Sequence, residues 1–188
     1  MFEKELNIKN LLSSLEDYTT EDLLQQNYKK EMISFFKNND NCFERSCSKG
    51  HFTASAWVIN SEETHILLMH HRKLGIWIQL GGHADGDENL LAVSIKEVLE
   101  ESGIKTRSIT DKIFDIAVHQ IPEYELDKEH YHYDVRFLLK STRNDTLIKN
   151  EESIDIRWFQ ANEECLPTKN PCIIRMLNKW LVYKNGKK

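Results

Sequence analysis

A glycine-rich loop followed at once by an acidic helix is the feature that most constrains the fold of this chain. Three glycines and two aspartates lie within Gly81–Asp87, directly after the apolar segment 77–80. Glycine allows backbone angles that other residues rarely adopt, so the segment predicts a tight loop. A helical pattern then continues to Ser102, with Asp87 as the expected N-cap and Gly103 as the left-handed terminating residue. We therefore expect a tight loop and a helix in succession.

The predicted helix carries three glutamates, Glu97, Glu100 and Glu101, on one face, because they are spaced three and four residues apart. The roughly opposite face holds Leu91, Ile95, Val98 and Ser102. Like charges at this spacing destabilise a helix by about 0.2–0.5 kcal/mol per pair. A solvated acidic face is one explanation. The other is a hard divalent cation, Mg²⁺ or Mn²⁺, which binds oxygen ligands and can bridge to substrate phosphates.

Composition narrows the class of protein. The chain has 188 residues, 40% of them hydrophobic, which is enough for one domain with a buried core. No apolar run approaches the roughly 20 residues that cross a bilayer, and the first residues do not resemble a secretory signal. The formal charge of −5 argues against binding to bulk nucleic acid. We expect a cytoplasmic protein with four free cysteine thiols, acting on a small molecule.

Apolar periodicity divides the chain into an N-terminal helical extension, residues 1–48, and a main domain, residues 49–188. Two helices are expected in the extension, the second capped by Thr20 and ending near residues 37–41. Residues 54–59 and 65–69 predict a hairpin. The later strands are expected at Ile113–Ile121, Tyr131–Leu139 and Ile154–Phe159, followed by a last helix from Pro171 to Tyr183.

The loop and helix together resemble the signature of the Nudix hydrolases. The matching residues are Gly82, Glu88 and the stretch Lys96–Ile104, which contains the three glutamates and Gly103. Chance agreement at six glycine and glutamate positions is on the order of 10⁻⁷ per starting point. The chain is thus similar to this family over about residues 49–188, and the extension lies outside the resemblance.

The resemblance implies an α/β/α sandwich with a mixed sheet. It also implies a metal-dependent pyrophosphohydrolase, which cleaves a diphosphate bond in a nucleoside diphosphate linked to another moiety by means of a metal-activated water. By position, Glu97, Glu100 and Glu101 would be catalytic and would bind Mg²⁺ or Mn²⁺. One of them, or a carboxylate from elsewhere in the chain, would act as the general base.

Other motif positions allow two interpretations. Glu88 is either a motif residue or a first-turn residue favoured by the helix dipole. Gly81 and Gly82 serve the loop geometry or offer a backbone carbonyl to a metal. Lys96 stands where the family usually has arginine, which braces a catalytic glutamate through a two-pronged contact. The hypothesis is that Lys96 gives a different brace or a reduced activity.

Further stretches resemble a bacterial branch of the same superfamily that has no assigned substrate. They are Gly50–Trp57, His70–Lys73, Trp77–Gly86 and His130–Phe137. On a strand, one face of the last stretch carries His130, His132, Asp134 and Arg136, and the other, core-like face carries Tyr131, Tyr133, Val135 and Phe137. We expect the first face to line the substrate pocket, with Arg136 on a phosphate and Asp134 orienting it or binding metal. The alternative is a solvated face of an edge strand.

Two residues are weaker candidates for substrate binding. His119 is either a ligand or a structural, hydrogen-bonded histidine. Arg72 lies in the basic cluster 70–73, which either meets a substrate phosphate or forms a solvated turn.

Two other functions compete with hydrolysis. A non-catalytic Nudix module that senses a nucleotide or binds a partner would typically have lost acidic motif residues, which this chain keeps. Isomerisation of an isoprenoid diphosphate would need a cysteine in the loop region, and none lies between Cys47 and Cys165. The N-terminal helices either pack on the core or form a homodimer, since their apolar residues need burial.

Overall fold

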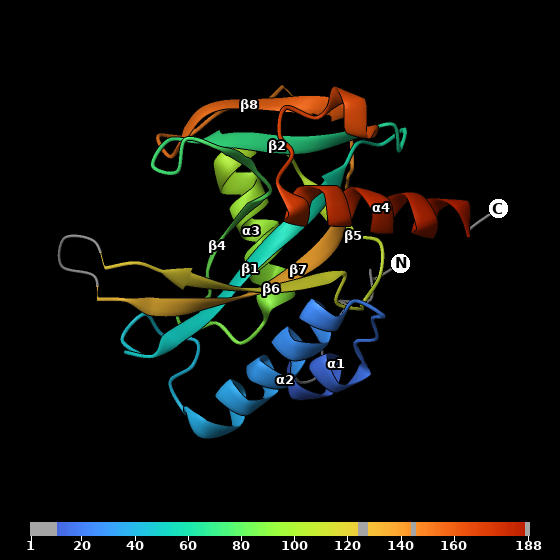
Figure 1. Cartoon of the computed structure of the whole chain (residues 1–188). Coiled ribbons are helices and arrows are strands. Elements are labelled where there is room, and N and C mark those ends of the chain that lie inside the picture. Colours follow the sequence, from blue (N-terminus) through green and yellow to red (C-terminus); the bar gives the residue numbers. More distant parts are fainter. Residues whose placement is uncertain (1–10, 124–127, 144–145, 187–188) are drawn as a thin grey trace, which may run out of the picture. The chain divides into compact units, whose positions relative to one another are not determined.

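The computed structural model describes residues 11–123, 128–143 and 146–186. Its elements in chain order (Figure 1) are α1 (Leu11–Asp17), α2 (Leu23–Asn38), β1 (Gly50–Ile59), β2 (His65–His71), β3 (Trp77–Ile78), β4 (Leu80–His83), α3 (Leu90–Ser102), β5 (Thr106–Ser108), β6 (Asp115–Ile121), β7 (His130–Ser141), β8 (Ser153–Gln160), a 3₁₀ turn (Glu163–Cys165) and α4 (Pro171–Asn185). None of the helices in these described ranges is long and apolar enough to cross a bilayer.

The chain forms two compact units, and β1, α3 and β7 each run from one unit into the other. The first unit comprises Met1–Ser55, Gly81–Ser94 and Ser108–Leu138, and the second comprises Ala56–Leu80, Ile95–Arg107 and Leu139–Lys188. The domain boundary that the sequence predicts between residues 48 and 49 stays a prediction.

The two predicted N-terminal helices are present in the first unit, where α1 and α2 lie side by side and α2 packs on β6 (Figure 1). The predicted cap of α2 is wrong. Asp22 is the N-cap, and its Oδ1 accepts hydrogen bonds from the backbone N–H groups of Leu24 at 2.8 Å and Gln25 at 3.3 Å. Thr20 lies too early for this role and instead accepts from the Asp22 N–H.

An aromatic cluster joins α2 to the strands of the first unit. The ring of Phe35 stacks on that of Tyr133 with centroids 4.0 Å apart, and Phe52 lies 5.7 Å from both. Phe36 and Phe43 extend the cluster. Burial raises the pKa of Tyr133 to about 12, so its hydroxyl stays protonated. Met32 and Phe35 of α2 are therefore covered within the chain, whereas Leu23 and Leu24 at its start are exposed.

β7 is an inner strand of the first unit. It pairs with β1, and it pairs antiparallel with β6 in a register that sets Asp115 opposite Arg136 and His119 opposite His132. The alternative of a solvated edge strand is thus wrong. Tyr133, Val135 and Phe137 are buried as predicted, but Tyr131 is exposed, since it stands near the start of the strand.

The second unit contains strands β2, β3 and β8 and helix α4. The predicted hairpin is confirmed, because β1 and β2 pair antiparallel with Val58 opposite Leu67, and β2 also pairs with β3 and β8. In α4, Asn170 caps the helix, Pro171 opens it, and every third or fourth residue is buried. Those buried residues are Ile173, Met176, Leu177 and Trp180.

α3 starts at Leu90, two residues later than a cap at Asp87 implied. The Asn89 side chain accepts from the N–H of Ala92 at 3.1 Å, whereas Asp87 accepts from the N–H of Asn89 and so closes the preceding turn. Glu88 therefore lies just before the helix and not in its first turn. Gly103 ends the helix with a φ of 72°, as predicted, and donates to the carbonyl of Leu99 at 2.8 Å.

Gly81 provides a test of the loop geometry. Its φ is 154°, and a Cβ there would lie 2.5 Å from the carbonyl oxygen of Ala54 and would also collide with Ser55. We expect Gly81→Ala to lower the free energy of unfolding by about 2–4 kcal/mol, measured by urea denaturation. Gly75→Ala is the control, because Gly75 also has positive φ but has open space around it. It should cost only about 1–2 kcal/mol. Equal losses for both variants would contradict the steric argument.

Candidate functional site

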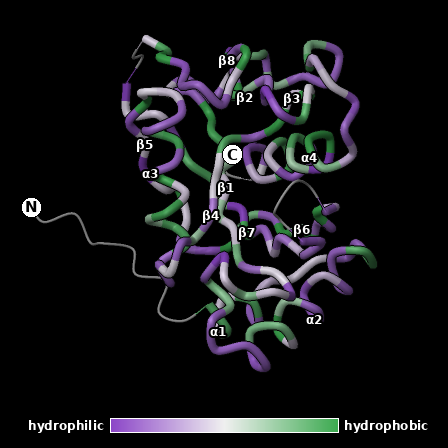
Figure 2. The backbone as a smooth tube through the Cα atoms, turned by 90° about the vertical axis from the view of Figure 1, so that its left-hand side faces the viewer, coloured by the Kyte–Doolittle hydropathy of each residue, from purple (hydrophilic) through white to green (hydrophobic). Residues whose placement is uncertain are grey.

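The three predicted glutamates lie on the part of α3 that belongs to the second unit. Figure 2 shows hydrophobic and hydrophilic residues interleaved along this helix. Glu101 is only 2% exposed, the side chain of Glu97 is 18% exposed and that of Glu100 is 56% exposed. The set therefore runs from solvent into the interior and is not the uniformly solvated acidic face that was the alternative.

Lys96 contacts this set only loosely. Its Nζ lies 3.9 Å from Oε1 of Glu97 and 3.8 Å from Oε2 of Glu100, and its side chain is 64% exposed. Both distances exceed hydrogen-bond length, so the ammonium acts as a nearby charge and not as a directional donor.

The glycine loop belongs to the first unit and is anchored there at several points. Asp85 has a φ of 49° and forms a two-pronged ion pair with Arg45, with atoms 2.5 and 2.7 Å apart. The hydrogen bond from Arg45 holds the pKa of Asp85 below its ordinary value. Gly86, at a φ of 88°, donates to the carbonyl of Phe43 at 3.0 Å. Gly82 is half-buried in β4.

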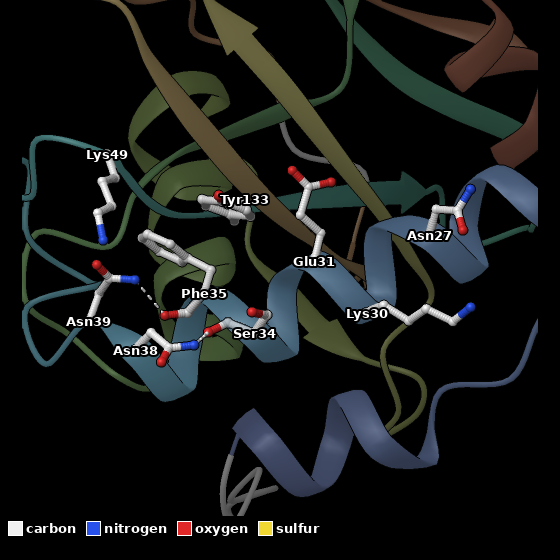
Figure 3. Close-up of a pocket in the computed structure, with 9 residues that line it drawn as sticks. All are labelled: Asn27, Lys30, Glu31, Ser34, Phe35, Asn38, Asn39, Lys49 and Tyr133. Carbon is white, nitrogen blue, oxygen red and sulfur yellow. Dashed lines mark hydrogen bonds between the residues drawn. The ribbon is translucent and has the colours of Figure 1, made fainter.

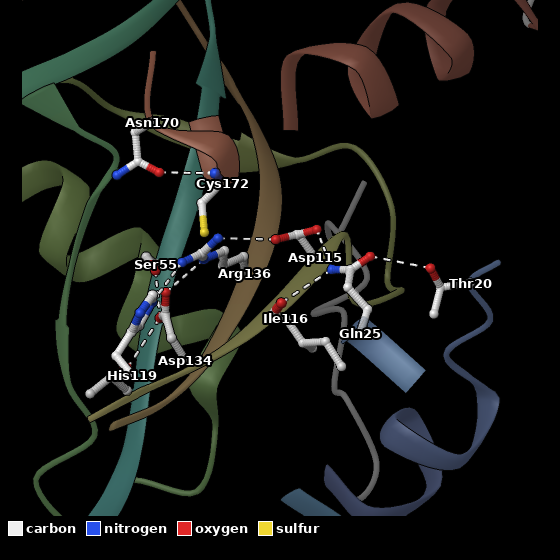
Figure 4. Close-up of polar contacts among 11 residues, drawn as sticks. Thr20, Gln25, Ser55, Asp115, Ile116, His119, Asp134, Arg136, Asn170 and Cys172 are labelled. Carbon is white, nitrogen blue, oxygen red and sulfur yellow. Dashed lines mark hydrogen bonds and ion pairs between the residues drawn. The ribbon is translucent and has the colours of Figure 1, made fainter. Parts of the chain in front are cut away.

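Arg136 lies at the centre of a buried polar network in the first unit (Figure 4). The side chain is 1% exposed, and all three guanidinium nitrogens are used. Nε donates to Asp134 at 2.7 Å, Nη1 donates to Asp115 at 3.0 Å and Nη2 donates to Nε2 of His119 at 3.0 Å. Gln25 of α2 also donates to Asp115, at 2.6 Å. The structure thus brings Arg136 together with Asp134, its neighbour on the predicted strand face, and with His119 of β6.

Asp134 is ionised within this network. Its burial alone would favour the neutral acid, but the charge of Arg136 and the hydrogen bonds from Ser55 and Arg136 outweigh burial and lower its pKa below the ordinary 3.8. Ser55 donates at 2.5 Å and Thr53 at 3.1 Å. Asp134 therefore contributes stability at pH values above about 4, and the contribution is lost as the pH falls further.

The remaining predicted residues lie elsewhere. His132 is grouped with three other histidines of the first unit, His51, His83 and His130. Arg72 belongs to the second unit and donates to the backbone carbonyls of Glu151 at 2.8 Å and Ser153 at 3.1 Å. Substrate contact by Arg72, His119, His132, Asp134 or Arg136 stays a prediction.

A shallow pocket of about 800 Å³ lies along α2 (Figure 3). Polar residues of the helix, together with Phe35, Lys49 and Tyr133, line it. The amides of Asn38 and Asn39 are turned back onto helix carbonyls, 2.7 and 2.8 Å away. The pocket holds none of the residues predicted to be functional.

Known proteins share this sequence pattern and fold. The model of the NUDIX domain matches residues 49–179, which is more than half of the chain. The chain belongs to the NUDIX family. No curated protein matches it in sequence. The match confirms the assignment to the Nudix hydrolases that the loop and the helix indicated.

Solved structures with the NUDIX fold align with most of the chain. An Ap4A hydrolase from C. elegans is 16% identical with a TM-score of 0.54, covering 72% of this chain and 98% of its own. A dihydroneopterin triphosphate pyrophosphohydrolase from E. coli is 12% identical with a TM-score of 0.54, covering 70% and 95%. A MutT NUDIX hydrolase from Burkholderia pseudomallei is 17% identical with a TM-score of 0.53, covering 68% and 95%. At these identities the likeness confirms the predicted fold class, the Nudix-type α/β/α sandwich with a mixed sheet.

The buried network of this NUDIX protein predicts a large and pH-dependent effect of losing Arg136. We expect Arg136→Met to lower the free energy of unfolding at pH 7 by about 3–5 kcal/mol, because two buried carboxylates lose their cation. The loss should shrink as the pH falls, because burial without the Arg136 charge raises the pKa of Asp134 in the variant and the acid becomes neutral. Denaturant titrations at pH 7 and pH 3.5 measure both effects. Arg157→Met is the control, since Arg157 forms an exposed pair with Asp155. Its loss should stay below about 1 kcal/mol.

Proposed function

We propose that this protein is a divalent-metal-dependent hydrolase, which cleaves a diphosphate bond in a nucleoside diphosphate linked to another moiety. The observation that carries the proposal is the graded set of carboxylates on α3, Glu97, Glu100 and Glu101, in a member of the NUDIX family. A set of three carboxylates within two helical turns suits Mg²⁺ or Mn²⁺, because both cations prefer oxygen ligands.

The burial of Glu101 supports a role in holding a cation. Glu101 is only 2% exposed, so its carboxyl group has lost most of its contact with water, and a bound divalent ion would offer its oxygens a positive charge in place of that hydration. Glu97 and Glu100 reach progressively more solvent and can exchange water for substrate oxygens. When bound, the cation neutralises phosphate charge and lowers the pKa of a coordinated water to near neutrality.

The chain's own residues would contribute the rest of the reaction. The carboxylates would orient the cation, and one of them, or a carboxylate from elsewhere in the chain, would take the proton of the attacking water. Helix α3 keeps the three side chains at fixed spacing, so that little rearrangement is needed as charge develops on the phosphoryl oxygens. Lys96 adds a positive charge beside Glu97 and Glu100.

The first test is hydrolysis of a substrate panel with Mg²⁺ or Mn²⁺. The panel contains nucleoside triphosphates, dinucleoside polyphosphates, nucleotide sugars, ADP-ribose and dinucleotide cofactors. Its first members are chosen from the names of two aligned structures, the Ap4A hydrolase and the dihydroneopterin triphosphate pyrophosphohydrolase. We expect turnover of at least one member, lost on adding EDTA. Glu101→Gln should lower kcat/KM by about 10²–10⁴-fold.

Glu164→Gln serves as the matched control, because this exposed glutamate lies outside α3, in the 3₁₀ turn. It should leave turnover unchanged. Silence across the panel, with intact binding of Mg²⁺ or Mn²⁺, would instead favour the non-catalytic module that binds a nucleotide or a partner.

Lys96 gives a second prediction. An arginine at this position has a planar fork that can reach a carboxylate through two hydrogen bonds, whereas Lys96 stays 3.8 Å or more from both neighbours. We expect Lys96→Arg to raise kcat several-fold with little change in KM. Lys105→Arg, another lysine of the second unit, controls for the exchange of residue type. An unchanged kcat for Lys96→Arg would show that the departure from the family pattern does not matter.

A further inference from the structure

Four histidines from three separate stretches of the chain converge in the first unit. Ring centroids of His51 lie 5.0 Å from His83, 4.8 Å from His132 and 5.1 Å from His130. The rings of His83 and His132 are 4.9 Å apart. Half of the eight histidines in the chain therefore meet at one place.

Three of them present nitrogen atoms with the spacing of a metal site. One ring nitrogen from each of His51, His83 and His132 lies within 4.8 Å of the other two. In a tetrahedral zinc centre with Zn–N distances of about 2.0–2.1 Å, nitrogen ligands are about 3.3 Å apart. Small rotations of the two half-buried rings, His83 and His132, would close the remaining gap.

His51 adds an independent observation. The residue is only 3% exposed, and neither Nδ1 nor Nε2 has a hydrogen-bond partner among the described residues. A buried imidazole normally satisfies its N–H group, so this arrangement is costly unless the ring has another role. Coordination of a metal through one nitrogen provides such a role for a buried ring that faces two further imidazoles.

His130 fixes the tautomer of its neighbour. Its Nδ1 must donate to the carbonyl of Lys128, 2.7 Å away, because a carbonyl can only accept. In the neutral ring Nε2 then carries a lone pair and accepts from Nε2 of His132, at 3.1 Å. His132 is left with one ring nitrogen whose lone pair is free to bind a metal.

The charge states agree with this arrangement. Burial, followed by the neighbouring His83, lowers the pKa of His51 to about 4 and that of His132 to about 3. Both rings are therefore neutral at neutral pH, which is the form that binds metals. Arg45 and Asp85 act on the pKa of His51 in opposite directions and form an ion pair with each other.

We propose that His51, His83 and His132 form a binding site for a transition metal of the zinc class, with His130 positioning His132. Imidazole ligands favour Zn²⁺, Co²⁺, Ni²⁺ or Cu²⁺ over Mg²⁺, whereas the carboxylates of α3 have the opposite preference. The two sets of ligands therefore select different metals, and the histidine site does not depend on the proposed hydrolysis. Three ligands leave one position of a tetrahedral centre open to water or an anion.

The test is a titration of the metal-free, full-length protein with Co²⁺, followed by visible absorption. We expect one Co²⁺ per chain, with the intense d–d bands of tetrahedral or five-coordinate cobalt. Zn²⁺ should abolish the bands at one equivalent, and a hundredfold excess of Mg²⁺ should leave them intact. Absence of the bands, or their displacement by Mg²⁺, would overturn the proposal.

Variants locate the site. His83→Asn and His132→Asn should each weaken Co²⁺ binding at least tenfold, and far-UV circular dichroism confirms that each remains folded. Should His51→Asn fail to fold, His83→Asn decides the question, because His83 is half-buried. His65→Asn, a change in the other unit, is the matched control and should bind Co²⁺ normally.

The acidic set needs its own control. The double variant Glu97→Gln with Glu100→Gln should keep the cobalt bands. Bands that survive the histidine changes but vanish in this double variant would assign the cobalt to α3 and refute the histidine site.

Discussion

A buried guanidinium is the interaction on which the first unit depends. The three guanidinium nitrogens of Arg136 donate hydrogen bonds to two aspartates and a histidine on β6 and β7. One of these aspartates, Asp115, also accepts a hydrogen bond from Gln25 of α2. In a low-dielectric interior such a network is favourable only when every member is satisfied, so each partner restricts the geometry of the others. The network therefore fixes the register of β6 and β7 as well as the position of α2 against β6.

The chain separates its candidate metal ligands by chemistry. Oxygen ligands are grouped on α3, where helical spacing alone brings them together. The candidate nitrogen ligands are grouped in the first unit, where the start of β1, the end of β4 and the start of β7 each contribute a histidine. Because hard and borderline cations prefer these donors differently, the two proposed sites would bind different metals.

The sequence predicts best what depends on local spacing. The helices of the N-terminal segment, the hairpin of β1 and β2, and α4 are all marked by apolar periodicity and by turn residues, and all are present. The caps at Thr20 and Asp87 were wrong, because several polar residues next to a helix start can each accept a backbone N–H, and only the folded geometry selects one of them.

Contacts between residues that are far apart in the sequence cannot be predicted from local spacing. The face of β7 suggested that Asp134 and Arg136 act together, yet the contributions of Asp115 and Gln25 depend on pairing with β6 and on the docking of α2. His51 and His83 lie within stretches that the sequence analysis singled out, but they stand about 80 and 50 residues before His132, and no periodicity predicts such a contact. The abundance of histidine in those stretches was the available signal.

The hydrogen bond from Gln25 to Asp115 has a consequence for how the protein can be shortened. A chain trimmed to residues 49–179 would keep every position that matches the NUDIX domain. It would also lose the amide that completes the shell of a fully buried carboxylate and the Phe35 ring that covers Tyr133. The boundary of the matched domain therefore differs from the boundary of a fragment that keeps its buried contacts. Helix α2 contributes side chains to the interior of the first unit, next to β6 and β7.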